Sequence, residues 1–120
     1  MDKERLDTIL IEASAKSDLV RSSRHACAIL YKGQILAVGN NKRKSHPMML
    51  KFNKESPKIF LHAEVDAIIK ILNHHGIEIL KDCTLYVIRT TRNGKLASSE
   101  PCEICKGIIR SFKIPQVFWS

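Results

Sequence analysis

The sequence has no long hydrophobic run, and its 120 residues include few aromatic ones: one Trp, two Tyr and four Phe. A helix that crosses a membrane needs about 20 consecutive, mainly apolar residues, and no stretch of this chain comes near that length. The start of the chain, Met1 to Glu4, is acidic and does not resemble a signal peptide. We therefore expect a cytoplasmic protein with no membrane partner.

Acidic residues are also scarce. Twelve Asp and Glu face twenty Lys and Arg, which gives a formal net charge of +8. An excess of this size favours an anionic partner. The length suits one domain, residues 1–120, with a core of its own and no second domain. No internal repeat or low-complexity segment divides the chain.

Only four cysteines are present. In a cytoplasmic chain, cysteines are more often thiols than disulfides. Cys27 lies in an apolar strand pattern and Cys83 comes just before another one, so we interpret both as unreactive core thiols. The other two, Cys102 and Cys105, belong to a motif described below.

The hydrophobic periodicity predicts a layered α/β domain. The elements that we expect are helices at 2–20, 61–75 and 102–112, a hairpin of strands at 25–31 and 34–38, and strands at 84–88 and 115–119. This order is typical of a mixed sheet in which an antiparallel pair is followed by parallel strands. A long connection at 40–61 carries six Lys or Arg residues, and such a connection is usually functional or disordered.

Two short motifs begin the second and third predicted helices. The first is His62-Ala63-Glu64, and the second is Pro101-Cys102 followed by Cys105. One imidazole and two thiolates are three zinc ligands, which leave a fourth position open for a water, as in catalytic zinc sites. Glu64 is a spare carboxylate that can carry protons. Alone, the cysteine pair could be a redox pair and His62 a capped core residue, but together the two motifs favour a catalytic zinc.

The positions of these residues on the helices also fit one site. Cys102 and Cys105 are three residues apart and share a helix face. His62 and Glu64 are two apart, but in a first turn both can reach a pocket beyond the helix end. We therefore expect the two helix N-termini to point at one place, where their dipoles favour thiolate over thiol.

Through these two motifs, and through Gly39-Asn40-Asn41, the chain from about residue 24 onward resembles the cytidine deaminase-like superfamily. It most resembles the zinc-dependent cytidylate and deoxycytidylate deaminases. The resemblance implies a three-layer α/β/α fold and a homo-oligomer, and the short C-terminus of this chain is a departure from the family. It also implies one zinc per chain on His62, Cys102 and Cys105, and proton transfer by Glu64. Asn41 would contact the nucleoside, and the Ala63 backbone N–H would face the base.

Three functions remain open. The leading hypothesis is a hydrolytic deaminase that converts dCMP, CMP or the nucleoside to the uracil form and releases ammonia, with Lys42, Arg43 and Lys44 at the phosphate. The alternative is a deaminase of a base within single-stranded DNA or RNA, whose backbone follows the same basic segment. A non-catalytic, zinc-stabilised nucleic-acid-binding module is the third. The scarcity of aromatics in the connection favours the free nucleotide, because polynucleotide grooves stack bases on aromatic rings. Asn41 fits a turn residue equally well.

Overall fold

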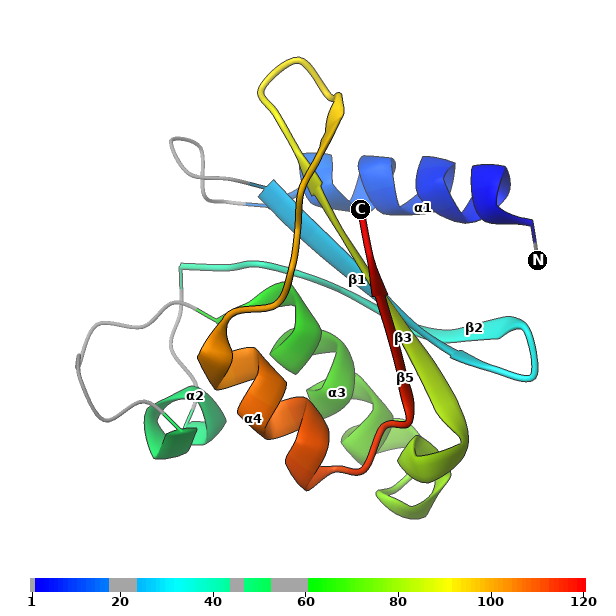
Figure 1. The fold of residues 1–120 in the computed structure, drawn as a ribbon, viewed down its shortest axis with the longest axis vertical. Helices are drawn as coiled ribbons and strands as arrows, with labels where there is room; N and C mark the ends of the chain where they lie inside the picture. The colour runs from blue at the N-terminus through cyan, green and yellow to red at the C-terminus, as the bar shows by residue number, and fades with distance from the viewer. Residues whose placement is uncertain (1, 18–23, 44–46, 53–60) are drawn as a thin grey trace.

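The computed structural model describes residues 2–17, 24–43, 47–52 and 61–120. Figure 1 shows their arrangement. The helices are α1 (Lys3–Ala15), α2 (Pro47–Phe52), α3 (Ala63–His74) and α4 (Glu103–Ser111), and η1 (Glu78–Asp82) is a 3-10 helix. The strands are β1 (Arg24–Tyr31), β2 (Gln34–Asn40), β3 (Cys83–Thr90), β4 (Leu96–Ala97) and β5 (Gln116–Trp119).

Strand β3 is the centre of a mixed sheet. One edge of β3 pairs antiparallel with the whole of β1. Its other edge is divided, because β5 pairs parallel with residues 84–87 and β4 pairs antiparallel with residues 89–90. Strands β1 and β2 form an antiparallel hairpin whose turn residues, Lys32 and Gly33, have positive φ angles. The expected antiparallel hairpin followed by parallel strands is thus confirmed.

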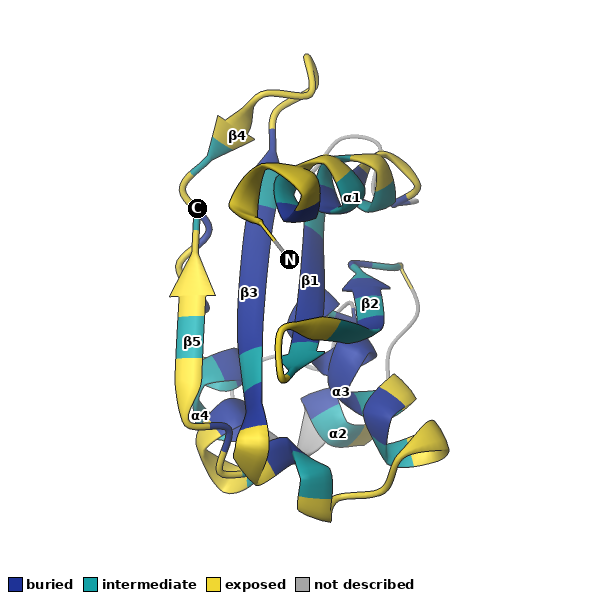
Figure 2. Cartoon of the chain, turned by 90° about the vertical axis from the view of Figure 1, so that its right-hand side faces the viewer, coloured by how far each residue is buried: buried dark blue, intermediate teal, exposed yellow. Residues whose placement is uncertain are grey.

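Helices cover both faces of this sheet (Figures 1 and 2). On one face, α1 packs through Leu6 and Leu10 onto a cluster that includes the small side chains Ala26 and Ala28. Tyr86 anchors the same helix, because its hydroxyl donates a 2.8 Å hydrogen bond to Asp7. On the other face, α3 and α4 pack on the alternate residues of β1 and β3, namely Cys27, Ile29, Leu85 and Val87. Side chains alternate between the faces of a strand, and the three-layer α/β/α prediction is confirmed.

The observed elements differ from the predicted ones in length and number. Helix α1 ends at Ala15, and residues 18–20 of the predicted helix lie outside the described residues. The long connection holds the short helix α2, which begins at Pro47, where a missing N–H removes no helical hydrogen bond. Elements as short as α2, η1 and β4 have too few residues to produce a periodic pattern. Among the described helices, none is long and apolar enough to cross a bilayer.

Gly39 allows β2 to approach the first turn of α3. A Cβ atom at this position would lie 2.5 Å from both the Ala63 carbonyl oxygen and the Ala67 amide nitrogen. Real Cβ atoms essentially never come this close, so any larger residue would separate the strand from the helix. The first turn of α3 also follows His62 directly. The Gly39 contact therefore sets where the proposed ligand lies relative to the sheet.

We predict that Gly39→Ala weakens zinc binding as well as the fold. The added methyl must displace α3, and overpacking of this kind costs about 1–3 kcal/mol in the free energy of unfolding. The control is Gly94→Ala, where a Cβ meets nothing within 4 Å but the φ angle of +75° strains the backbone. Urea unfolding and zinc titration of both variants check this. Equal zinc affinity in the two variants would show that the Gly39 contact does not position the ligands.

Candidate metal centre

His62 and Cys102 occupy equivalent places in the structure, because each is the N-cap residue of a helix. His62 precedes α3, and Cys102 precedes α4. Both have extended backbone angles, and neither side chain caps its own helix. Pro101 therefore lies one residue before the N-cap of α4. The two side chains are left available to meet each other beyond the helix ends.

The segment before Cys102 is tied to the sheet. The buried hydroxyl of Ser99 donates a 2.8 Å hydrogen bond to the carbonyl of Val87 in β3. The guanidinium of Arg89 donates a 2.7 Å hydrogen bond to the Ser98 carbonyl. These contacts fix the approach of the chain to α4, as the Gly39 contact does for α3. Both helix starts are thus positioned from the same sheet.

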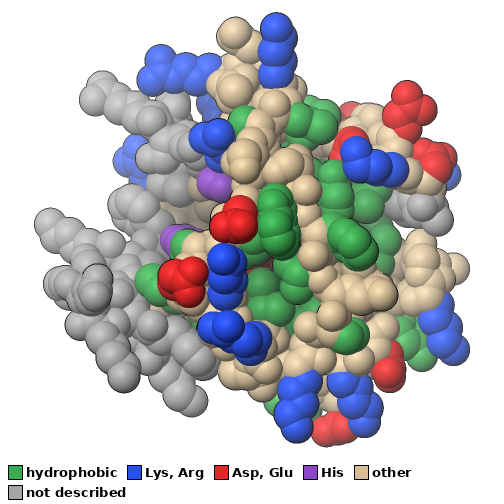
Figure 3. Space-filling model, viewed as in Figure 1, with side chains coloured by type: hydrophobic (Ala, Val, Ile, Leu, Met, Phe, Trp, Pro, Cys, Tyr) green, Lys and Arg blue, Asp and Glu red, His purple; other side chains and the backbone are tan. Residues whose placement is uncertain are grey.

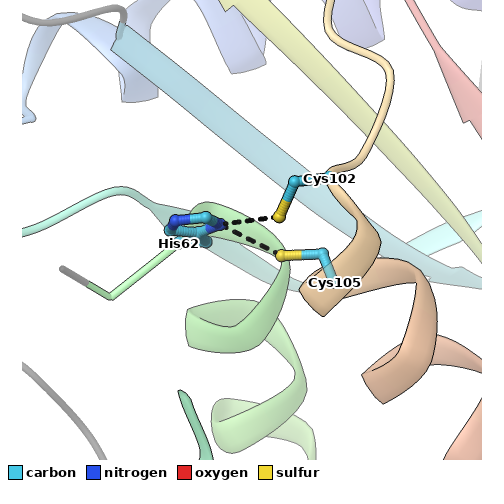
Figure 4. A group of neighbouring side chains, drawn as sticks. All are labelled: His62, Cys102 and Cys105. Atoms are coloured by element: carbon cyan, nitrogen blue, oxygen red, sulfur yellow. Dashed lines mark hydrogen bonds between the residues drawn. The ribbon is translucent and has the colours of Figure 1, made fainter. Parts of the chain in front are cut away.

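His62, Cys102 and Cys105 come together at one point (Figure 4). His62 Nδ1 lies 3.2 Å from the Cys105 sulfur and 3.5 Å from the Cys102 sulfur, and all three ligand atoms lie within 4.8 Å of one another. Around a tetrahedral zinc, ordinary Zn–N and Zn–S bond lengths put such atoms about 3.6 Å apart. The expected convergence of the two helix starts is confirmed, and the spacing and donor types fit zinc.

The ligands also perturb one another's protonation. The hydrogen bond from Cys105 and the hydrogen bond with His62 lower the pKa of the Cys102 thiol to about 3, against the opposing effect of burial. The same hydrogen bond to Cys102, together with burial, raises the pKa of Cys105. The hydrogen bond with Cys102 raises the pKa of His62. The lowered pKa of Cys102 favours its thiolate, which is the form that binds metal.

Glu64 lies beside this centre in the first turn of α3. Its side chain is buried, and burial raises the pKa of its carboxyl group, while a hydrogen bond with Cys105 acts in the opposite direction. Cys27 lies beneath it in β1: burial, and then the charge of Glu64, raise the pKa of that thiol. Cys27 and Cys83 are both buried free thiols. A buried carboxyl group with a raised pKa is suited to both accepting and releasing a proton.

Asn41 lies next to His62, and its amide oxygen is already engaged. An isolated antiparallel bridge joins Lys42 to Leu61, with a 2.9 Å hydrogen bond from the Lys42 amide to the Leu61 carbonyl. Because the bridge is antiparallel, it brings Asn41, the residue before Lys42, alongside His62, the residue after Leu61. The Asn41 side-chain oxygen accepts a 3.0 Å hydrogen bond from the backbone N–H of His25. Contact of Asn41 with a nucleoside stays a prediction.

The three predicted phosphate contacts have different surroundings. Lys42 forms an ion pair with the buried Asp66 of α3, so its ammonium already has a partner within the protein. Arg43 is exposed, and Lys44 lies outside the described residues. The sequence shows Asp66 as a second carboxylate two residues after Glu64, in the first turn of the same helix, but it gives no sign of the contact with Lys42.

Comparison with known proteins agrees with this site. The whole chain, residues 1–120, matches the family model described as the cytidine and deoxycytidylate deaminase zinc-binding region. The tRNA-specific adenosine deaminase of Streptococcus pyogenes serotype M18 is 32% identical over 93 residues, which are 78% of this chain and 46% of that protein. The tRNA-specific adenosine deaminase subunit tad2 of Schizosaccharomyces pombe is 28% identical over 94 residues, which are 78% and 19% of the two chains. The chain thus spans less than half the length of these curated relatives.

The fold has close counterparts among solved structures. The cytidine deaminase of Burkholderia pseudomallei superposes with a TM-score of 0.68 at 16% sequence identity. The match covers 98% of this chain and 81% of that protein. At such low identity the likeness concerns the fold alone. It extends over nearly the whole chain.

We predict about one zinc per chain, as the three ligands with one open position require. Cys105→Ala should abolish or greatly weaken zinc binding, because it removes a ligand from the buried side of the site. Cys83→Ala makes the same chemical change outside the site and should keep the metal. Elemental analysis of protein purified without chelator measures both. A metal-free native protein, or full zinc content in Cys105→Ala, would contradict the assignment.

Proposed function

Because this chain belongs to the family of cytidine and deoxycytidylate deaminase zinc-binding domains, we propose that it hydrolytically removes an amino group from adenine within RNA. The observation that carries this proposal is the 28–32% identity, over 78% of the chain, to tRNA-specific adenosine deaminases. The net charge of +8 supports a polyanionic substrate. The base must leave the RNA stack to reach a site of this kind, so the substrate position lies in a loop or other single-stranded region.

The side chains of the site have distinct roles in this proposal. His62, Cys102 and Cys105 would hold a zinc ion, which when bound would supply a Lewis acid that lowers the pKa of a water molecule. Glu64 accepts a proton from the attacking water, delivers it to the ring nitrogen, and later helps to protonate the departing ammonia. The balanced change is that water replaces the exocyclic amine with oxygen and releases ammonia. The Ala63 amide belongs to the first turn of α3, whose N–H groups have no acceptor within the helix and can meet the base.

The sequence alone ranks free cytosine nucleotides first, because the basic connection has few aromatic residues. The relatives favour the alternative, a base within a polynucleotide. Lys42, the first of the expected phosphate contacts, is paired with Asp66. dCMP and CMP therefore become the second candidate substrates, which the family description still includes.

A direct assay distinguishes the two substrate classes. Zinc-loaded protein is incubated separately with an RNA stem–loop that carries one loop adenosine, the same RNA with cytidine in that place, its DNA counterpart, dCMP and CMP. Deamination raises the product mass by about one unit, so mass spectrometry detects each reaction. We expect turnover of the adenosine RNA to exceed all others. Turnover of dCMP or CMP without turnover of RNA would overturn the proposal and restore the free nucleotide.

We predict that Glu64→Gln keeps the zinc and the fold but loses nearly all activity on the best substrate. The amide cannot accept a proton, and general acid–base catalysis is worth roughly a hundred- to ten-thousand-fold per step. Glu78→Gln is the control, since it makes the same change at an exposed position in η1. Single-turnover rates and zinc content of both variants measure the effect. If Glu64→Gln keeps the native rate, another group must move the protons.

A further inference from the structure

Asp66 binds three donors with one carboxylate oxygen. Its Oδ2 accepts a 3.1 Å hydrogen bond from the Asn40 backbone N–H, forms an ion pair with the Lys42 ammonium, and lies 3.4 Å from the Lys70 ammonium. The Asp66 side chain is only 8% exposed. Lys70 has a second partner, because it donates a 2.7 Å hydrogen bond to the Val38 carbonyl. Lys42 is thus the cation most directly committed to Asp66.

The ion pair lies at the margin of the metal centre. Lys42 pairs with Leu61, the residue before His62, and Asp66 donates its own backbone N–H to the His62 carbonyl at 3.0 Å. Lys42 also follows Asn41, the predicted nucleoside contact. The Lys42 backbone therefore lies beside the residue that precedes His62, while its ammonium is held by Asp66 of α3.

We propose that Asp66 is a specificity-determining residue, which withholds the Lys42 ammonium from substrate and so disfavours free nucleoside monophosphates relative to RNA. This inference rests on the proposed function, because it explains how a deaminase of polynucleotides would reject the monomers. A monophosphate carries all its negative charge in one group and needs a cation close to the site. RNA spreads its phosphates along the chain and can bind through cations elsewhere on the surface.

The burial of Asp66 makes this withdrawal effective. A phosphate that recruits Lys42 would leave a buried carboxylate without its nearest cation, and stranding one member of a buried ion pair is strongly unfavourable. The remaining Lys70 is more distant from Oδ2, and its ammonium already has an acceptor. The phosphate therefore gains little from Lys42 while Asp66 carries its charge. Removing that charge should release Lys42 without removing it.

The test measures the phosphate contribution to binding with reaction products, which cannot be turned over. Dissociation constants of zinc-loaded protein are determined by calorimetry for inosine and inosine 5′-monophosphate, and for uridine and uridine 5′-monophosphate. Within each pair only the phosphate differs, so the ratio of the two constants isolates its effect. Four proteins are compared: native, Lys42→Gln, Asp66→Asn and the double variant. Asp66→Asn retains an oxygen for the Asn40 N–H.

We expect Lys42→Gln to have the same ratio as the native protein. In Asp66→Asn we expect the monophosphate to bind about tenfold or more tightly, relative to the nucleoside, than it does in the native protein, because a charge-assisted contact to phosphate contributes that much. The double variant should return to the native ratio, because no ammonium is left to release. Glu78→Gln, which changes the net charge equally at an exposed site, should leave the ratio unchanged.

Two results would overturn the inference. A selective loss of monophosphate affinity in Lys42→Gln alone would mean that Lys42 already contacts phosphate in the native protein. An unchanged ratio in folded, zinc-loaded Asp66→Asn would mean that Asp66 withholds nothing. If Asp66→Asn does not fold, a selective loss of monophosphate affinity in Lys42→Gln would still overturn the inference. These ratios do not depend on RNA turnover, so failure of the RNA assay with the expected ratios would overturn the proposed function alone.

Discussion

The meeting of two helix starts is the constraint on which this structure depends. His62 and Cys102 are forty residues apart in the chain, and each is the N-cap of a separate helix. Neither helix would hold its cap at the site by itself. The sheet provides the common reference, because β2 contacts the first turn of α3 at Gly39 and β3 holds Ser99, close before Cys102. The metal ligands can therefore be brought together by the fold before any ion binds.

The sequence was informative wherever the signal was local. The hairpin, the buried strand β3 and each of the two ligand motifs follow from residues close together in the chain, and the structure confirms the elements and brings the three ligands together. Contacts between distant segments gave no such signal. Nothing near Lys42 indicates that its ammonium meets Asp66, because this contact depends on how β2 lies against α3. Short elements such as α2 and β4 were missed for a related reason, since tertiary packing, not periodicity, stabilises them.

Two acidic residues in one turn of α3 show how surroundings decide chemical role. Glu64 faces a cysteine and the metal centre, and burial raises the pKa of its carboxyl group. Asp66 is buried almost as deeply, yet three nitrogen donors surround one of its oxygens. The first environment suits a group that exchanges protons, and the second holds a carboxylate among backbone and ammonium donors. Two residues of the same class, two positions apart, are thus held in different environments by the fold.

The two cysteines of the metal centre differ in exposure, so the centre has a side near the solvent and a side within the core. Cys102 is exposed, whereas Cys105 is buried. A zinc-donating molecule, a chelator or an alkylating reagent from solution can reach the sulfur of Cys102, but not that of Cys105. Ligand exchange would therefore begin at Cys102 and proceed inward, so that the outer thiolate acts as the entrance for the ion and the inner one as its anchor. Loading and loss of the metal would follow the same route in opposite order.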